Sequence, residues 1–172
     1  MGEKTVNNLL AAFAGESQAR NKYTFFASVA RKEGWLEIAE FFEEAAKNEK
    51  EHAEIIFKLL KGIGDSKANL QVAIAGETYE YKDMYPAFLK DALEEGETAA
   101  AQYFETVATV EEHHAKRFAE LFAGLEQGKL LQKDTSVKWK CRECGFIHEG
   151  SEPPDKCPLC GHDKTYYKPE VC

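Results

Sequence analysis

Two short stretches of this sequence each place a carboxylate and an imidazole three residues apart. Glu49 and His52 form the first pair, and Glu111 and His114 form the second. Residues at i and i+3 share one helix face, and in both stretches this face otherwise carries apolar residues at helical spacing. An ionised carboxylate in a core without a countercharge is strongly destabilising. Two Glu/His pairs at corresponding places on apolar helix faces therefore predict a bound metal.

The elements that must position these residues are helices. Hydrophobic periodicity predicts four of them, over residues 3–32, 35–61, 68–94 and 97–123. Gly34 and Gly96 fall between members of each pair, and 125–137 is a polar linker. The pattern predicts a mainly α fold, with a four-helix bundle in residues 1–135 and a small metal-binding ribbon in residues 136–172.

The four predicted helices are two copies of one hairpin. Residues 14–17 match residues 75–78 at an offset of 61, whereas Glu49 matches Glu111 at an offset of 62. One residue is therefore inserted in the third helix, and Pro86 in the same interval predicts a helix irregularity there. The repeat also indicates that His114, rather than the adjacent His113, is the counterpart of His52.

The repeat adds three carboxylates to the candidate site. Glu16 and Glu77 correspond, and Glu80 has Ala19 as its counterpart. The full set of candidate ligands is Glu16, Glu49, His52, Glu77, Glu80, Glu111 and His114. Its five negative charges roughly balance two iron ions with an oxide or hydroxide bridge. One Glu from each of two helices and a Glu-x-x-His from each of the others is the di-iron or di-manganese pattern of ferritin-like bundles.

Two tyrosines follow the first ligand of each repeat. Tyr23 and Tyr85 lie seven and eight residues after Glu16 and Glu77. One interpretation is a core tyrosine whose hydroxyl has found a partner. The other is a donor that orients a ligating carboxylate.

Four of the five cysteines lie between residues 141 and 160. They form two Cys-x-x-Cys knuckles, Cys141 with Cys144 and Cys157 with Cys160. Four thiolates make a tetrahedral site that suits iron or zinc, and a module of this size needs the metal in order to fold. The predicted small core consists of Trp139, Phe146, Tyr166 and Tyr167, with His148 and His162 outside the ligand set and Cys172 a free thiol.

The net charge of −8 argues against nucleic acid and anionic membranes as partners. No apolar run approaches the length of a membrane span, and the N-terminus has no apolar signal-like segment. We therefore expect a cytoplasmic protein, where clustered cysteines indicate metal ligands before disulfides.

In this order, the motifs resemble those of the rubrerythrin family over essentially the whole chain. The matching stretches are 14–17, 49–53, 76–81, 84–86, 111–115 and the two knuckles. The resemblance implies a non-haem di-iron peroxidase that reduces hydrogen peroxide to water in oxidative-stress defence. It implies that Glu49 and Glu111 bridge the irons, and that His52 and Glu80 exchange as ligands of one iron. Tyr23 and Tyr85 match the family's tyrosines beside the ligands.

The resemblance also implies partners. The four cysteines would hold one iron, or zinc if misloaded, as an electron relay, supplied by a donor such as rubredoxin or an NAD(P)H-dependent reductase. A homodimer with electron transfer between chains is expected. The connection at 61–69 is shorter than in some relatives. Two alternatives are a ferritin-like ferroxidase, which needs no relay, and a binding module whose knuckles hold zinc.

Overall fold

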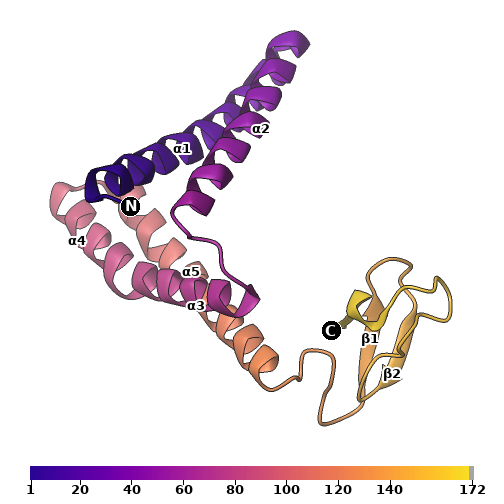
Figure 1. Cartoon of the computed structure of the whole chain (residues 1–172). Helices are drawn as coiled ribbons and strands as arrows, with labels where there is room; N and C mark the ends of the chain where they lie inside the picture. Colours follow the sequence, from indigo (N-terminus) through magenta and orange to yellow (C-terminus); the bar gives the residue numbers. More distant parts are fainter. Residues whose placement is uncertain (171–172) are drawn as a thin grey trace. The chain divides into compact units, whose positions relative to one another are not determined.

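The computed structural model describes residues 1–170 of the chain and is mostly helical (Figure 1). It divides into two compact units, one covering residues 1–65 and the other beginning at Ser66. Cys172, expected to be a free thiol, lies outside the described residues. The boundary predicted at residue 135 stays a prediction.

The first unit is a hairpin of helices α1 (Glu3–Glu33) and α2 (Leu36–Leu59). Gly34 ends α1 in the left-handed conformation, at φ 87°, and its N–H points back to the last carbonyls of the helix. The side chains buried in this hairpin are all small, namely Ala27, Ala30, Ala39, Ala46 and Ala53. Small residues let the two helices pack closely, and they leave the larger apolar side chains on the outside of the pair.

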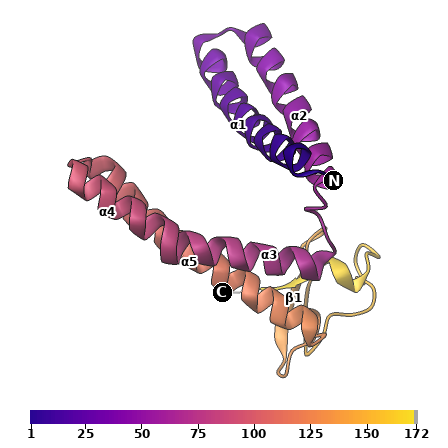
Figure 2. The ribbon, with the colours of Figure 1, turned by 60° about the vertical axis from the view of Figure 1, so that its left-hand side comes forward.

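The second unit repeats this hairpin with one difference (Figure 2). Its first arm consists of α3 (Ser66–Tyr79), a π-helical segment η1 (Glu80–Met84) and α4 (Tyr85–Glu95), and its second arm is α5 (Thr98–Glu126). The predicted irregularity is therefore confirmed, although it takes the form of a π segment just before Pro86. The inserted residue fits because a π turn holds one residue more than an α turn. Pro86 lies at the start of α4, where its missing N–H costs little.

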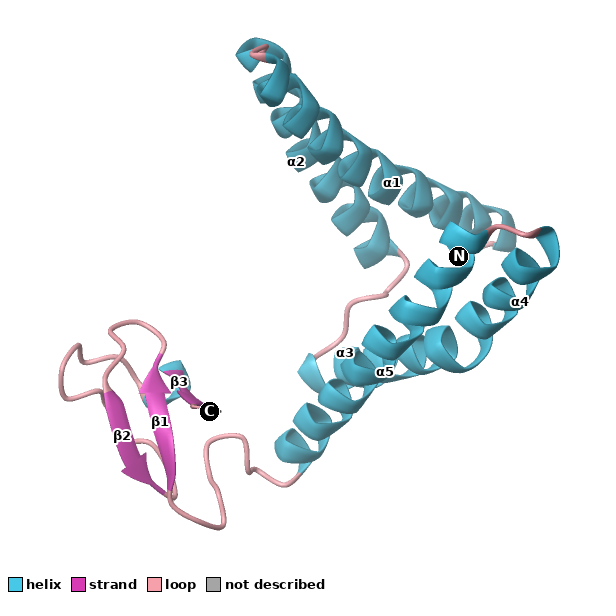
Figure 3. Ribbon diagram, turned by 180° about the vertical axis from the view of Figure 1, so that it is seen from behind, coloured by secondary structure: helices cyan, strands magenta, loops and turns pink. Residues whose placement is uncertain are grey.

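A small antiparallel sheet follows (Figure 3), with strands β1 (Val137–Cys141), β2 (Ile147–Gly150) and β3 (Tyr167–Pro169) in the order β2-β1-β3. Trp139 and Tyr167 are fully buried in its core, and Phe146 packs against them. The Trp139 indole N–H donates to the Gly150 carbonyl at 3.0 Å. The expectation that Tyr166 belongs to this core was wrong. It ends a short 3-10 turn and is 41% exposed, with its ring packed against that of His162 at a tilted angle.

Candidate metal centres

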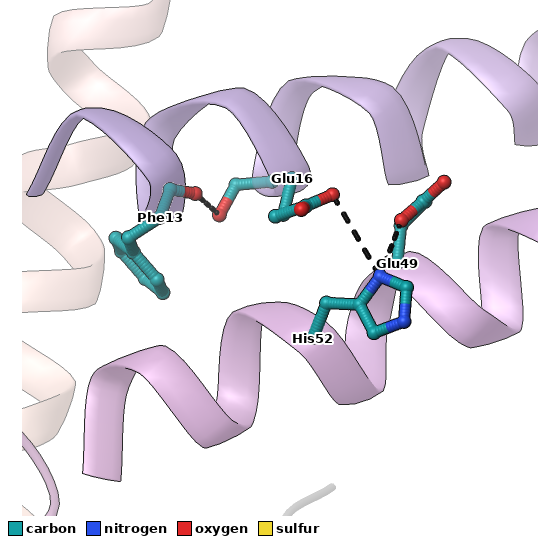
Figure 4. Close-up of polar contacts among 5 residues, drawn as sticks. Phe13, Glu16, Glu49 and His52 are labelled. Carbon is teal, nitrogen blue, oxygen red and sulfur yellow. Dashed lines mark hydrogen bonds and ion pairs between the residues drawn. The ribbon is translucent and has the colours of Figure 1, made fainter. Parts of the chain in front are cut away.

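The first group of candidate ligands joins the two helices of the first hairpin (Figure 4). Glu16 comes from α1, and Glu49 and His52 come from α2, with one ligand atom of each within 4.8 Å of the others. The His52 Nδ1 atom lies 2.8 Å from Glu49 Oε2 and 4.0 Å from Glu16 Oε2. We call these three residues the first Glu/His group.

The second hairpin repeats the arrangement. Glu77 of α3 meets Glu111 and His114 of α5, again within 4.8 Å, and we call these residues the second Glu/His group. The His114 Nδ1 atom lies 2.7 Å from Glu111 Oε2 and 3.6 Å from Glu77 Oε2. His114, and not the adjacent His113, occupies this position, as the repeat predicted.

Both groups have a donor set that fits a metal ion. The Glu49 and Glu111 side chains are 19% and 13% exposed, whereas His52 and His114 are about half exposed, at 55% and 48%. Carboxylate oxygens and imidazole nitrogens converging from two helices suit first-row metal ions such as iron and manganese. Each histidine of these four side chains faces the glutamate three residues before it.

The raised pKa values of one acid in each Glu/His group also favour a bound metal. A hydrogen bond to Glu49, then burial and the negative charge of Glu49, raise the pKa of Glu16 above its ordinary value of 4.5. Burial, followed by a hydrogen bond to Glu111, raises the pKa of Glu77. Adjacent carboxyl groups cannot both ionise without cost. A cation in each group would remove this conflict, and for that reason we regard the residues present as fitting a metal.

Glu80 stands apart from the second Glu/His group. It is partly buried at the start of η1, and its negative charge contributes to the raised pKa of Glu77. The structure thus places Glu80 near the group without bringing it into the set of three. Its role as an exchanging ligand stays a prediction.

An aromatic cluster accompanies each Glu/His group in its hairpin. Tyr23 packs on Phe26 and Phe42, at centroid distances of 6.4 and 5.9 Å. These positions correspond, at an offset of 62, to a second cluster formed by Tyr85, Phe88 and Phe104. The repeat therefore extends beyond the ligands to the packing around them.

The two tyrosines differ in their surroundings. Burial, and then the neighbouring Tyr103 and the charges of Glu80 and Glu111, raise the pKa of Tyr85. Tyr103 corresponds to Phe41 in the first hairpin, so Tyr23 lacks this hydroxyl neighbour. The two positions therefore differ in their polar neighbours, and a role of either tyrosine as a donor beside the metal ligands stays a prediction.

The four knuckle cysteines form a third group. The Sγ atoms of Cys141 and Cys160 are 3.7 Å apart, and those of Cys144 and Cys157 are 3.6 Å apart. A tetrahedron with metal–sulfur bonds of about 2.3 Å has sulfur–sulfur edges of about 3.8 Å, whereas a disulfide bond measures about 2.05 Å. The four thiols are free and have the spacing of a tetrathiolate metal site.

Local sequence explains this geometry. Gly145 and Gly161 follow the second cysteine of each knuckle, and both adopt φ 77°, a conformation that favours glycine. Their N–H groups donate to the carbonyls of Cys141 and Cys157 at 3.0 and 2.9 Å. Each Cys-x-x-Cys-Gly segment therefore closes into the same turn and turns both sulfurs of the knuckle to one side.

A tyrosine that the sequence reasoning assigned only to the core also acts on the thiols. Burial disfavours the Cys157 thiolate, but the Tyr167 hydroxyl and backbone amides at Cys160 and Leu159 outweigh it and lower the pKa of Cys157 to about 6. The Tyr167 hydroxyl is buried and makes no hydrogen bond of ordinary length among the described residues. Nothing in the local sequence marks this role, because it depends on how β3 returns beside the second knuckle.

His162 is a second neighbour of the cysteines. Its Nδ1 lies 3.3 Å from Cys160 Sγ, and its ring packs on Tyr166 with the centroids 4.4 Å apart. The four sulfurs form the group without it.

In residues 1–170, no helix is long and apolar enough to cross a membrane.

Comparison with known proteins gives two family matches. Residues 7–122 match the model of the family described as Rubrerythrin, and residues 139–168 match that of the rubrerythrin rubredoxin-like domain. The chain is 41% identical to the rubrerythrin of Nitratidesulfovibrio vulgaris, over 97% of this chain and 94% of the relative. It is 44% identical to that of Porphyromonas gingivalis, over 98% and 90%.

A solved structure of nigerythrin in a mixed-valence state is 34% identical over 99% of this chain and 88% of its own. Its TM-score of 0.36 is too low to support a shared arrangement of the units. The alignment with the N. vulgaris protein spans 180 positions, more than the 172 residues of this chain, so that relative carries residues that this chain lacks.

Proposed function

Because the chain belongs to the rubrerythrin family, we propose that it is a peroxidase that reduces hydrogen peroxide to water. The family implies a di-iron centre and a rubredoxin-like iron site. One observation carries the proposal: a single chain holds two matching Glu/His groups together with a tetrathiolate group of metal-site dimensions. Hard ligands suit metals that meet oxygen species, and thiolates suit an iron that carries one electron.

The residues that would hold the di-iron centre are those of the two Glu/His groups. By the family pattern, Glu49 and Glu111 would each contribute to holding both metals, and Glu16 and Glu77 would each hold one of them. His114 would hold the metal of Glu77, and His52 and Glu80 would serve as alternative ligands of the other. Cys141, Cys144, Cys157 and Cys160 would hold the third iron.

Peroxide reduction consumes two electrons and two protons and yields two molecules of water, and two bound irons would supply one electron each. The chain's own contribution is to hold the ligands and the protons. Glu49 and Glu111 are held beside their histidines by hydrogen bonds of 2.8 and 2.7 Å. The Tyr85 hydroxyl, kept protonated by burial and by nearby acids, is available as a proton donor at the second Glu/His group.

The tetrathiolate group also distinguishes the competing functions. A ferroxidase requires the Glu/His groups but no electron relay, so the four cysteines would have no purpose in it. A zinc docking module requires the cysteines alone and leaves the Glu/His groups unexplained. The chain has both kinds of site, and for this reason the peroxidase is the better account.

Three further proposals complete this function. Electrons arrive from a donor such as rubredoxin or an NAD(P)H-dependent reductase. The protein works as a homodimer in which the tetrathiolate iron of one chain serves the di-iron centre of the other. The compartment is reducing, most simply the cytoplasm, where clustered cysteines serve as metal ligands before they form disulfides.

Metal analysis joined to two activity assays tests the proposal. We expect three irons per chain, a red oxidised form from the ferric tetrathiolate, and peroxide turnover with a reductant. Zinc in the cysteine site with a colourless protein would support the docking module. Rapid oxidation of added ferrous iron with formation of a mineral core, without peroxide turnover, would support the ferroxidase.

A further inference from the structure

We infer that the Tyr167 hydroxyl donates a hydrogen bond to the sulfur of Cys157 when the four knuckle cysteines hold iron, and that this bond stabilises the reduced form of the electron relay. The inference rests on the proposed function, because it takes the metal of the cysteine site to be iron. It identifies a positioning residue that sets the reduction potential of the site without being a ligand.

The first observation is an unused hydroxyl in the core of the ribbon. Tyr167 is 2% exposed and forms one buried cluster with Trp139, Cys141 and Cys157. Its oxygen is the buried side-chain polar atom, within residues 1–170, that makes no hydrogen bond of ordinary length. Burying a hydroxyl without a partner destabilises the folded state. Its place in this core therefore indicates an acceptor in the working protein.

The acceptors around this hydroxyl are sulfurs. Strand β3 pairs antiparallel with β1, with Tyr167 opposite Cys141, so the phenol lies on the inner face of the sheet together with the knuckles. Burial, then an interaction with Cys157 and the negative charges of Cys141 and Cys144, raise the pKa of Tyr167. The phenol therefore keeps its proton and can act only as a donor toward the thiolates.

Backbone amides also act on the sulfurs, but in the same way in both knuckles. The amide of Phe146 hydrogen-bonds to Cys144, and the corresponding amide of His162 hydrogen-bonds to Cys160. These bonds accompany the fold of each Cys-x-x-Cys-Gly turn. The Tyr167 hydroxyl is an additional side-chain donor, which one substitution can remove while both turns stay formed.

A donor beside a thiolate favours the reduced iron. The ferrous tetrathiolate carries one more negative charge than the ferric form, so a hydrogen bond to sulfur stabilises it more. The effect is stronger in a dry core than at the surface, where water competes for the same acceptor. One electron enters the iron, no covalent bond forms or breaks, and the phenol keeps its proton. The relay is thus held reduced and ready for peroxide, which is a far stronger oxidant.

A redox titration of the full chain, followed by the visible absorbance of the ferric site, tests the effect. Tyr167→Phe keeps the buried ring and removes only the hydroxyl. At a fixed solution potential we expect the ferrous-to-ferric ratio of this variant to be about tenfold lower than in the wild type, a fall of about 59 mV in reduction potential. Tyr166→Phe is the matched control, because that neighbouring ring lies at the surface, and its potential should equal that of the wild type.

Two results of the titration would overturn the inference. One is equal potentials in the wild type and Tyr167→Phe. The other is an equal shift in Tyr167→Phe and Tyr166→Phe, which would assign the change to the strand and not to the buried hydroxyl.

Nuclear magnetic resonance of the cadmium-substituted full chain tests the hydrogen bond itself. Cadmium has the divalent charge of ferrous iron, and an NMR-active isotope reports scalar coupling to a proton that is hydrogen-bonded to one of its sulfur ligands. We expect a slowly exchanging Tyr167 hydroxyl proton that couples to the cadmium in the wild type and in Tyr166→Phe. A hydroxyl proton without this coupling, or no slowly exchanging hydroxyl proton, would overturn the inference even if Tyr167→Phe failed to fold.

Neither measurement uses peroxide or the Glu/His groups. Equal potentials in a protein that still turns over peroxide would therefore overturn this inference and leave the proposed function standing. Zinc in the cysteine site of the isolated protein, without peroxide turnover, would overturn the proposed function, whereas the cadmium measurement would still decide whether the hydrogen bond forms.

Discussion

The backbone N–H of Tyr85 donates to the carbonyl of Glu80, five residues earlier in the chain. This i+5 bond lets the second hairpin hold one residue more than the first between its ligand Glu77 and its aromatic cluster. In the first hairpin, Glu16 and the corresponding aromatic cluster are separated by one residue fewer, and no such bond is needed. The π segment therefore keeps the face of the helix in register while it adds a residue beside Glu80.

Deleting Lys82 should remove this π segment. Glu77 and Tyr85 would then have the spacing of Glu16 and Tyr23, so we expect the helix and the iron content to be retained. Because π turns are rare and concentrate at functional sites, we expect a melting temperature higher by a few degrees and a lower peroxidase rate. Calorimetry and a turnover assay measure both effects.

The control is deletion of Arg20, at a comparable place in α1. There is no π turn in α1 to absorb the loss, so Glu16 and Tyr23 would be rotated apart by about 100°. We expect this variant to lose iron. If both deletions behave alike, the π segment has no special role.

The metal-free protein should become less stable as the pH rises through the raised pKa of Glu16. A carboxyl group whose pKa is higher in the folded state binds its proton more tightly when folded. Its contribution is present at acidic pH and is lost as the pH rises through the folded pKa. Urea unfolding of the chelator-treated protein at a series of pH values measures this loss.

Glu49→Gln is the matched variant, since it removes the charge that raises the pKa of Glu16. The loss of stability with rising pH should be smaller in this variant. An equal loss in both proteins would show that the two acids do not share a proton.

Tyr167→Phe should weaken the tetrathiolate site without removing a ligand. Without the hydroxyl, the pKa of Cys157 rises from about 6, and protons compete better with the metal. We expect about a tenfold loss of metal affinity and metal release at a higher pH, followed by visible absorbance. Tyr166→Phe is the control, because that exposed ring lies on His162; an equal effect there would contradict the role of Tyr167.

Glu80→Ala should separate metal binding from turnover. The variant keeps both Glu/His groups, so we expect both irons to remain bound, with His52 as ligand in the oxidised and the reduced forms. Turnover should fall at least tenfold if the exchange between His52 and Glu80 matters. Crystal structures of the wild type in both redox states, with the iron unmoved, would count against the exchange.

The meeting of the Glu and His side chains within each hairpin, and the repeat itself, were predictable because they are encoded in local spacing. Glu49 and His52 lie three residues apart, and the change of offset from 61 to 62 located the inserted residue. The role of the Tyr167 hydroxyl was not predictable, since it depends on how a strand returns beside a distant knuckle. Phe41 of α2 is 69% exposed, because one hairpin alone cannot cover its outer apolar side chains.

Peroxide oxidation of the reduced tetrathiolate iron tests the account most directly. The fully reduced protein is mixed anaerobically with hydrogen peroxide, and the return of the red ferric absorbance is followed in the wild type and in Glu111→Ala, which keeps all four cysteines. We predict rapid return of the colour in the wild type and a rate at least a hundredfold lower in the variant. Equal rates would show that peroxide reacts without the Glu/His groups and would contradict the assignment.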